Sequence, residues 1–147
     1  MNLKLRPATI DDIKSILQIY AEALDNGNVL PVKKAKIIFL KQAQYPDYQV
    51  FVSELNGKIV GTFALLIMEN MAHLGTPSAV VEDVGVLPEM QGKGIGKAMM
   101  EFALKYAKEK GCYKMSLSSN LRREKAHQFY ESLGFKKHGF SFLMELI

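Results

Sequence analysis

The sequence is poor in the features that mark secreted and membrane-bound proteins. Cys112 is the only cysteine, so no disulfide can form within the chain, and this favours a reducing compartment. No segment approaches the roughly 18 consecutive apolar residues that span a membrane. The first residues, Met1 to Pro7, include no apolar stretch of the kind found in secretory signals. We therefore expect a cytoplasmic protein without a membrane partner.

Strong charge is also missing. The formal net charge is +4, and the lysines and arginines are spread along the chain without a long basic run. Tryptophan is absent and no nucleic-acid-binding motif occurs. We expect no nucleic acid partner, and a basic nucleic-acid-binding domain is kept only as a remote alternative. The histidines and the cysteine show none of the spacings of zinc sites, so no metal is expected.

What is present suits one globular domain spanning residues 1–147, because 48% hydrophobic and 23% charged residues are enough to build a single core. Hydrophobic periodicity and turn residues predict a mixed α/β (α+β) domain with one central sheet. Helices are expected near 9–25, 32–44, 94–110 and 122–133, and strands near 3–6, 50–52, 59–68, 79–86, 113–117, 135–137 and 140–146. A helix joins the fourth and fifth strands, which predicts that those two run parallel.

Three glycines, Gly92, Gly94 and Gly96, stand between a buried strand and an amphipathic helix. Backbone N–H groups in the first turn of a helix have no helical partner, and the helix dipole is positive there. Glycine lets the backbone adopt positive φ and approach an anion closely, and Lys93 and Lys97 add positive charge. The segment therefore predicts a cradle for a phosphate group.

Two familiar phosphate loops do not fit this segment. The Walker A pattern fails because Gly96-Lys97 is followed by Ala98 and because Gln91 stands where its first glycine should be. The dinucleotide fingerprint fails because its last glycine would fall on Lys97 or Met99. The pattern that does fit is Q/R-x-x-G-x-G/A, met at Gln91, Gly94 and Gly96.

This pattern resembles the pyrophosphate loop of the GNAT superfamily of N-acetyltransferases. Further segments resemble that family in the same order along the chain: Arg6-Pro7-Ala8-Thr9 with Asp12, Val86-Leu87-Pro88, Asn120, Phe129-Tyr130 and Leu133-Gly134-Phe135. The resemblance implies the GNAT fold, a mixed sheet of about six to seven strands flanked by about four helices. Its parallel fourth and fifth strands would be splayed apart.

The resemblance also implies that acetyl-coenzyme A is the co-substrate. Its pyrophosphate would be held by the loop residues Gln91, Gly92, Lys93, Gly94, Ile95, Gly96 and Lys97. Its pantetheine arm would lie along the backbone near Val84 and Val86, with Gly85 as a natural place for the bulge that starts the splay. Asn120 would contact the same arm or, equally, cap the following helix.

Acetyl transfer requires a neutral amine, whereas an alkylammonium of pKa about 10.4 is neutral for only roughly one molecule in a thousand near pH 7.4. Glu82 and Asp83 lie inside an apolar strand, where a carboxylate needs water or a partner. Adjacent strand residues point to opposite faces, so at most one of the two is expected to line a given cleft. By resemblance Glu82 is the first candidate base and Asp83 the second, although both could pair with lysines.

Tyr130 resembles the tyrosine that serves the family as a hydrogen-bond or proton donor to the leaving thiolate. The alternative is a tyrosine that is only packed in the core. His127 lies three residues earlier on the same helical face. It could assist the base or contact the substrate, or could simply be packed or exposed.

Two branches of the family suggest an acceptor. Segments near Arg122, Tyr130 and Phe140 resemble aminoalkylphosphonate acetyltransferases, and Val81-Glu82-Asp83-Val84 with Gly111-Cys112-Tyr113 resembles glucosamine-6-phosphate acetyltransferases. The hypothesis is a small primary amine that bears an anion, bound by Arg122 or Arg123. A protein or peptide N-acetyltransferase and a non-catalytic coenzyme A sensor are the alternatives, and a homodimer is common in the family.

Overall fold

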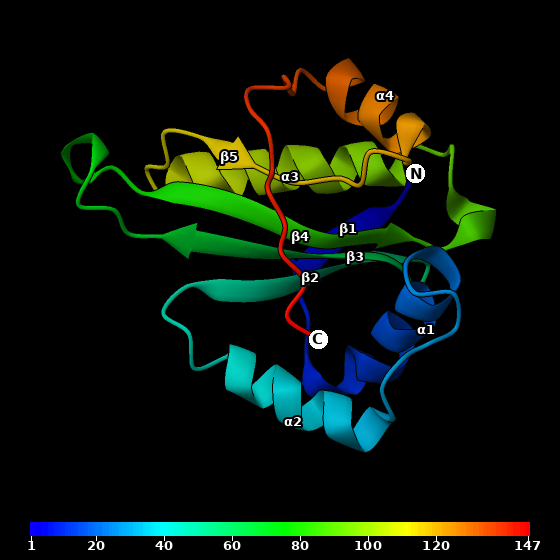
Figure 1. Cartoon of the computed structure of the whole chain (residues 1–147). Helices are drawn as coiled ribbons and strands as arrows, with labels where there is room; N and C mark the ends of the chain where they lie inside the picture. Colours follow the sequence, from blue (N-terminus) through cyan, green and yellow to red (C-terminus); the bar gives the residue numbers. More distant parts are fainter. The chain divides into compact units, whose positions relative to one another are not determined.

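The computed structural model describes all 147 residues and divides into two compact units, Met1–Ser116 and Leu117–Ile147 (Figure 1). The first contains the sheet, three α-helices and the glycine loop. The second contains one α-helix and the C-terminal segment.

The first unit is built on one five-stranded sheet with the order β1-β2-β3-β4-β5. Its strands are β1 (Leu3–Pro7), β2 (Tyr48–Leu55), β3 (Lys58–Met68), β4 (Ser78–Val86) and β5 (Met115–Ser116). Neighbours from β1 to β4 are antiparallel, and β4 pairs with β5 in parallel, which confirms the predicted direction. The hairpin between β2 and β3 turns at Asn56 and Gly57, both with positive φ, as a tight two-residue turn requires.

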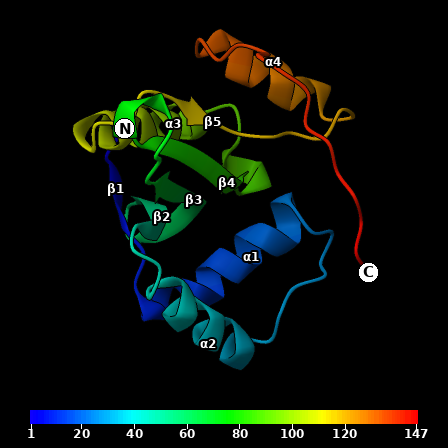
Figure 2. The same cartoon turned by 60° about the vertical axis from the view of Figure 1, so that its left-hand side comes forward.

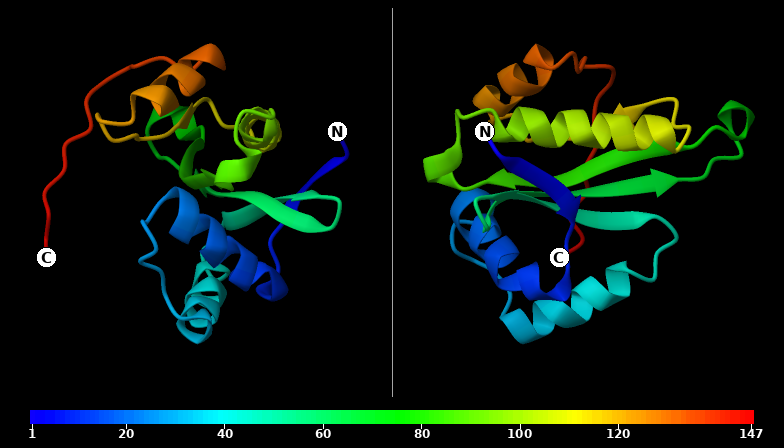
Figure 3. Two further views of the ribbon diagram at one scale, coloured as in Figure 1. Left: turned by 90° about the vertical axis from the view of Figure 1, so that its right-hand side faces the viewer. Right: turned by 180° about the vertical axis from the view of Figure 1, so that it is seen from behind.

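Helices cover both faces of this sheet. The helices are α1 (Ile13–Ala23), α2 (Val32–Gln42) and α3 (Ile95–Glu109), and a short 3-10 turn at Ile10–Asp12 precedes α1. Figures 2 and 3 show α3 on one side of the strands and α1 with α2 on the other. A β-carbon at Gly61 would meet Met99 of α3, whereas one at Gly85 would meet Ile19 of α1. The two glycines thus identify opposite faces, each allowing a helix to approach closely.

The core beneath α3 is aromatic. The Phe51 and Phe63 rings stack with centroids 5.2 Å apart, and Phe102 of α3 meets Phe51 edge-on at 5.2 Å. Phe51 and Phe63 are almost completely buried. Aromatic pairs of this geometry add to the stabilisation that burial itself provides, so the sheet and α3 form a rigid support for the loop at the start of that helix.

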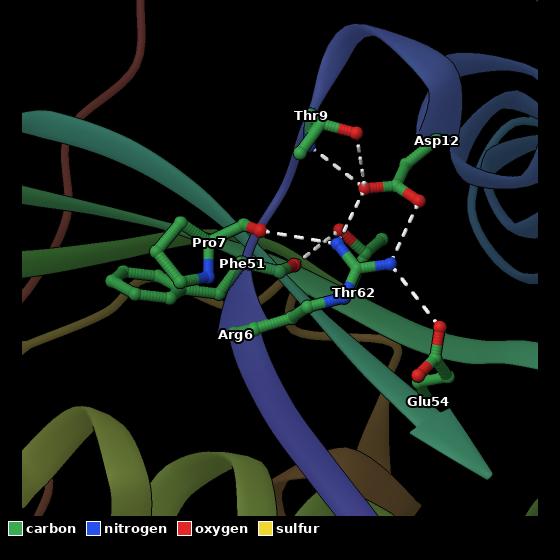
Figure 4. A network of polar contacts seen from close by, with 7 residues as sticks. All are labelled: Arg6, Pro7, Thr9, Asp12, Phe51, Glu54 and Thr62. Carbon is green, nitrogen blue, oxygen red and sulfur yellow. Dashed lines mark hydrogen bonds and ion pairs between the residues drawn. The ribbon is translucent and has the colours of Figure 1, made fainter. Parts of the chain in front are cut away.

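An ion-pair network ties the beginning of the chain to the sheet (Figure 4). Both guanidinium nitrogens of Arg6 donate to the Asp12 carboxylate, at 2.7 and 3.0 Å, and one also reaches Glu54 on β2 at 3.2 Å. The same carboxylate accepts the backbone N–H of Thr9 at 2.7 Å. These hydrogen bonds, the Arg6 pair first, hold the pKa of Asp12 below its ordinary value. They fix the turn that leads into α1.

The second unit contains α4 (Glu124–Ser132) and no strand. The expected strands at 135–137 and 140–146 are therefore wrong, and the sheet has five strands instead of six to seven. An alternating apolar pattern forms a strand only where a hydrogen-bonded neighbour exists, and this unit offers none. Gly134 follows α4 with a φ of 96°, as expected of the glycine that ends this helix.

None of the helices is both long enough and apolar enough to cross a membrane.

Candidate functional site

The glycine loop occupies the turn between β4 and α3. Gly92 and Gly94 have φ values of 76° and 84°, so both adopt the left-handed conformation expected of them. Gly96 does not, because it already lies in the first turn of α3. A β-carbon at Gly92 or Gly94 would meet no atom within 4 Å, so these positions face open space.

The loop leaves its backbone donors free. The first helical hydrogen bond runs from the N–H of Ala98 to the carbonyl of Gly94 at 3.1 Å, and no N–H from Gly92 to Lys97 donates to a backbone carbonyl. The segment is exposed except for Gly96, which is half-buried, and Ile95, which is buried and anchors the helix start. Several neighbouring N–H groups without backbone acceptors, together with the positive end of a 15-residue helix, are suited to a phosphate or pyrophosphate.

Side chains around the loop hold it in place and supply charge. Gln91 donates from Nε2 to the carbonyl of Val86 at 3.1 Å, which ties the loop to the end of β4. Lys97 lies 3.9 Å from Glu101 within α3. Lys93 forms no ion pair, and its ammonium is 3.9 Å from the sulfur of Met90. Lys93 is therefore the basic side chain of the loop whose charge is not already paired.

One edge of β4 lacks a strand neighbour over most of its length. The pairing with β5 consists of Ala79 with Met115 and Val80 with Ser116, and it stops there. From Val81 to Val86, β4 is paired in the sheet with β3 alone. The backbone at Val84 and Val86 can therefore hydrogen-bond to a ligand arm, and the predicted separation of the fourth and fifth strands is confirmed.

The bulge in β4 lies upstream of the predicted position. Gly85 pairs with Thr62 and Glu82 pairs with Ala64, so Asp83 and Val84 together oppose Phe63. Asp83 takes up the extra length with a φ of 53°, a conformation that Asp tolerates better than most residues. Gly85 has another function, since its missing β-carbon makes room for Ile19 of α1.

The bulge changes which residues share a face. Glu82 and Gly85 now lie on the α1 side, whereas Val86 pairs with Gly61 and lies on the α3 side. Simple alternation along a strand would place Glu82 and Val86 on the same face, whereas here they lie on opposite faces. The extra residue in the strand reverses the alternation after Glu82.

Two phenols, Tyr20 and Tyr48, lie within the electrostatic reach of Asp83, and Glu82 reaches Tyr48 alone. Burial, and then the charge of Asp83, raise the pKa values of Tyr20 on α1 and Tyr48 on β2, and the charge of Glu82 raises that of Tyr48 further. Burial and the charge of Asp83 also raise the pKa of Glu82, while burial and Asp25 raise that of Asp83. Two adjacent carboxylates thus influence the pKa of the same side chain, that of Tyr48.

Neither carboxylate forms an ion pair in the first unit, so the alternative of pairing with lysines is not met there. A carboxyl with a raised pKa and an exposed side chain can take a proton from a substrate ammonium. Tyr20 and Tyr48 were missed by sequence reasoning, because nothing in the local pattern places them beside the carboxylates. Only the register of the sheet and the packing of α1 do so.

The second unit contains the remaining predicted residues. Tyr130 packs between Phe129 and Phe135, with ring centroids 5.2 and 5.7 Å away. Burial raises the pKa of its phenol and the charge of Arg123 opposes this shift, so the group remains protonated at neutral pH. Phe135 also donates its N–H to the Tyr130 carbonyl at 3.1 Å.

Asn120 organises the turn before α4. Its side-chain oxygen accepts the N–H of Arg122 at 2.9 Å, and its carbonyl accepts the ring Nε2–H of His127 at 2.8 Å. The hydrogen bond of Asn120 falls ahead of the helix, which begins at Glu124, so it stabilises the turn and does not cap α4 itself. The second ring nitrogen of His127 and the guanidinium of Arg122 form no hydrogen bond within this unit.

Comparison with known proteins identifies the family. The family model described as "Acetyltransferase (GNAT) family" matches residues 13–135. The chain belongs to this family. It is 32% identical over 138 residues to glucosamine 6-phosphate N-acetyltransferase of Trypanosoma brucei brucei, covering 94% of this chain and 92% of that one. It is 30% identical over 143 residues to aminoalkylphosphonate N-acetyltransferase of Salmonella typhimurium, covering 97% and 91%.

A solved structure of an acetyltransferase from Trypanosoma brucei superposes with a TM-score of 0.85 at 30% identity, covering 99% of this chain and 100% of that one. The predicted GNAT fold and the predicted N-acetyltransferase activity are thereby confirmed.

Proposed function

We propose that this GNAT enzyme transfers the acetyl group of acetyl-coenzyme A to the primary amine of a small molecule. The observation that carries the proposal is the loop from Gly92 to Lys97 at the start of α3, whose backbone N–H groups have no backbone acceptors. Membership of an acetyltransferase family supplies the reaction type.

The residues present fit acetyl-coenzyme A, which supplies an activated thioester. The N–H groups of the loop suit its pyrophosphate, and Lys93 adds an unpaired charge. The free edge of β4 beside Val84 and Val86 suits the amides of its pantetheine arm, as a further strand would. Asn120 remains a candidate contact for that arm, by family resemblance.

Glu82 is the proposed base. The ammonium of the substrate gives a proton to this carboxylate, directly or through water, and the freed lone pair attacks the thioester carbon. Burial and the charge of Asp83 raise the pKa of Glu82 toward the range in which a carboxylate accepts protons readily. Asp83 is the second candidate for the same role.

Tyr130 is the proposed donor to the leaving group. As the carbon–sulfur bond breaks, its phenol hydrogen-bonds to the departing thiolate and supplies the proton that completes the thiol. The second proton lost by the attacking nitrogen, as the amide forms, restores the phenol. The raised pKa keeps the phenol protonated beforehand. His127 and Arg122 are retained as candidate substrate contacts by resemblance.

Two relatives are named for phosphorus-bearing amines, glucosamine 6-phosphate and aminoalkylphosphonate, and both names favour a small acceptor over a peptide. A coenzyme A sensor that lacks catalysis is disfavoured because Glu82 and Tyr130 are both retained. We further propose that residues 1–147 act as one catalytic domain, since the family match crosses from one unit into the other. A cytoplasmic location and a homodimer complete the proposal.

The test is the consumption of acetyl-coenzyme A against a panel of amines, with free coenzyme A measured by chromatography because Cys112 can react with thiol reagents. The panel contains aminophosphonates, amino-sugar phosphates, diamines, amino acids and a lysine peptide. Turnover of one small-amine class, lost or strongly reduced in Tyr130→Phe and Glu82→Gln, is the expected result. Turnover of the peptide alone would overturn the small-molecule acceptor, and binding without turnover of any amine would favour the sensor.

A further inference from the structure

The segment between residues 26 and 46 holds the excess positive charge of the whole chain. It contains no aspartate or glutamate and four lysines, Lys33, Lys34, Lys36 and Lys41. Of the 19 lysines and arginines in the chain, the other 15 are matched in number by the 15 acidic residues, so the formal net charge of +4 is that of this segment. All four lysines are exposed, and none forms an ion pair within the first unit. Their charge is therefore free to meet an anionic partner.

Three of these lysines stand where a helix disfavours positive charge. Lys33 and Lys34 lie in the first turn of α2, which contains no acidic residue, and Lys36 follows in the second turn. The start of a helix is the positive end of its dipole, so the first two lysines weaken the isolated helix. Lys33 and Lys36, three residues apart, also repel each other. Local preferences that oppose the fold are expected at functional sites, and an anion at this face would relieve both effects.

The outward side of α2 is an apolar ridge surrounded by lysines. Ala35 is the one buried residue of the helix and Phe39 is half-buried, so these two mark its inward side. Ile37 and Leu40, three residues apart, lie on the opposite side and are 52% and 57% exposed. Helical spacing places the four lysines around these two side chains. We call this side the lysine face, and it comprises Lys33, Lys34, Lys36, Ile37, Leu40 and Lys41.

The lysine face is convex and lies on the outside of the first unit. α2 packs mainly against α1, and Figures 2 and 3 show it beyond α1 on the side away from the sheet. A flat lipid surface can meet a convex ridge, whereas small molecules and helical peptides are held in clefts or grooves. At a bilayer the apolar side chains enter the acyl boundary, while the lysine stems extend and keep their ammonium groups among the headgroups.

Other partners fit this face less well. Two copies of the face would bring two sets of four lysines together, and like charges repel. The phosphates of a nucleic acid would pair with the lysines but would leave Ile37 and Leu40 without an apolar partner, and the face has no aromatic ring on which a base could stack. An anionic bilayer offers negative charge at its surface and hydrocarbon directly beneath it.

We infer that the lysine face binds peripherally to the surface of an anionic lipid bilayer. α2 lies in the plane of the bilayer, with Ile37 and Leu40 inserted between headgroups and the lysines paired with lipid anions. The inference is independent of the proposed acetyltransferase function. It departs from the expectation, drawn from the sequence, of a protein without a membrane partner. That expectation rested on the lack of a spanning segment, which a peripheral contact does not require.

The experiment is co-sedimentation of the full chain with vesicles of phosphatidylcholine alone or with about 30% phosphatidylserine. We expect the partition coefficient for the anionic vesicles to exceed that for the neutral vesicles by about tenfold or more at about 0.1 M salt. The difference should shrink at about 0.5 M salt, because salt screens the lysines. Equal partition into both kinds of vesicle, or no binding to either, would overturn the inference while leaving the acetyltransferase proposal intact.

Variants locate the binding on α2. Lys33→Gln combined with Lys36→Gln removes two charges and should lower the partition coefficient for anionic vesicles about tenfold. Leu40→Ser removes an exposed apolar side chain and should also lower it about tenfold, with the steepness of its salt dependence unchanged. All three positions are exposed, so the circular dichroism spectrum should stay that of the unmodified protein.

Matched controls come from α3. Lys105→Gln combined with Lys108→Gln removes two exposed lysines at the same spacing, neither of them in an ion pair within the first unit. Leu104→Ser removes a leucine that is 40% exposed. Both controls should leave the partition coefficient unchanged, and losses equal to those of the α2 variants would overturn the assignment to the lysine face.

Two further measurements separate the other partners. Sedimentation equilibrium that shows a dimer dissociated by Leu40→Ser, without vesicle binding, would overturn the inference and assign the face to a second copy of the chain. Binding to duplex RNA that requires Lys33 and Lys36 but not Leu40, again without vesicle binding, would overturn it in favour of a nucleic acid.

Discussion

A β-carbon on Gly85 would lie 2.8 Å from Cγ2 of Ile19 in α1, closer than such carbons approach in folded proteins. Ile19 is fully buried, so it has no free space into which to move. The pair sets the distance between α1 and β4, and thereby the position of the strand that contains Glu82.

Replacing Gly85 by alanine should therefore destabilise the fold. We expect Gly85→Ala to lower the free energy of unfolding by about 1–3 kcal/mol, because α1 must shift away from the strand. Denaturant unfolding followed by circular dichroism measures this. Gly139→Ala is the control, since a β-carbon there meets nothing within 4 Å and φ is not positive. Equal stability of the two variants would contradict the close approach of α1.

The Arg6–Asp12 pair predicts a pH-dependent contribution to stability. The pKa of Asp12 is lowered in the folded chain, so the contribution is complete above the ordinary carboxyl pKa and is lost as pH falls through the folded value. Asp12→Asn should cost about 2 kcal/mol near neutral pH, and its difference from the unmodified protein should shrink in acid. Urea midpoints across pH test this. Glu54→Gln, which removes a single longer contact to Arg6, should cost less.

The neighbouring carboxylates predict a shift in the pH–rate profile. The charge of Asp83 helps to raise the pKa of Glu82. Asp83→Asn removes that charge, so the acid limb of kcat/KM should move to lower pH. Glu82→Gln should reduce kcat/KM by about 10²–10⁴ and abolish that limb. Glu89→Gln, an exposed carboxylate paired with Lys58, is expected to leave the profile in place. An acid limb that persists in Glu82→Gln would exclude Glu82 as the base.

Alanine substitutions at two glycines beside α3 should affect stability equally but coenzyme A binding differently. Gly94 and Gly111 flank opposite ends of α3 with φ values of 84° and 81°. Alanine at either position costs about 1–2 kcal/mol of backbone strain, so both variants should lose similar stability. Only Gly94→Ala should also disturb the N–H groups of the loop, raising the Kd for coenzyme A by about tenfold or more. Isothermal titration of both variants with coenzyme A measures the two Kd values. Equal values would contradict the prediction that the loop N–H groups bind the pyrophosphate.

Sequence reasoning succeeded where a local pattern is sufficient. The expected helix at 94–110 matches Ile95–Glu109 within one residue at each end, because a left-handed glycine stands on each side of it. The parallel direction of the fourth and fifth strands followed from the helix that joins them. The anion-binding character of the loop followed from glycine spacing at a helix start.

It failed where the outcome depends on a neighbour distant in the sequence. The alternation of residues 140–146 is suited to a strand, but no pattern shows whether another strand lies beside it. The bulge was assigned to Gly85, whereas contact with Ile19 requires that glycine and Asp83 takes the strained position. The pairing of Glu82 with Ala64 and of Gly85 with Thr62 depends on the register between two strands, which no local window contains.

The open edge of β4 has a consequence for the protein's solubility. A strand edge with free N–H and C=O groups can pair with a strand of another molecule, and such pairing leads to aggregation. From Val81 to Val86 this edge carries two adjacent charges, at Glu82 and Asp83, and a bulge that breaks its regular spacing. Charges and bulges are the devices by which proteins make an edge unfit for such pairing. The two carboxylates assigned to substrate chemistry thus also oppose aggregation by strand pairing at this edge whenever acetyl-coenzyme A is not bound along it.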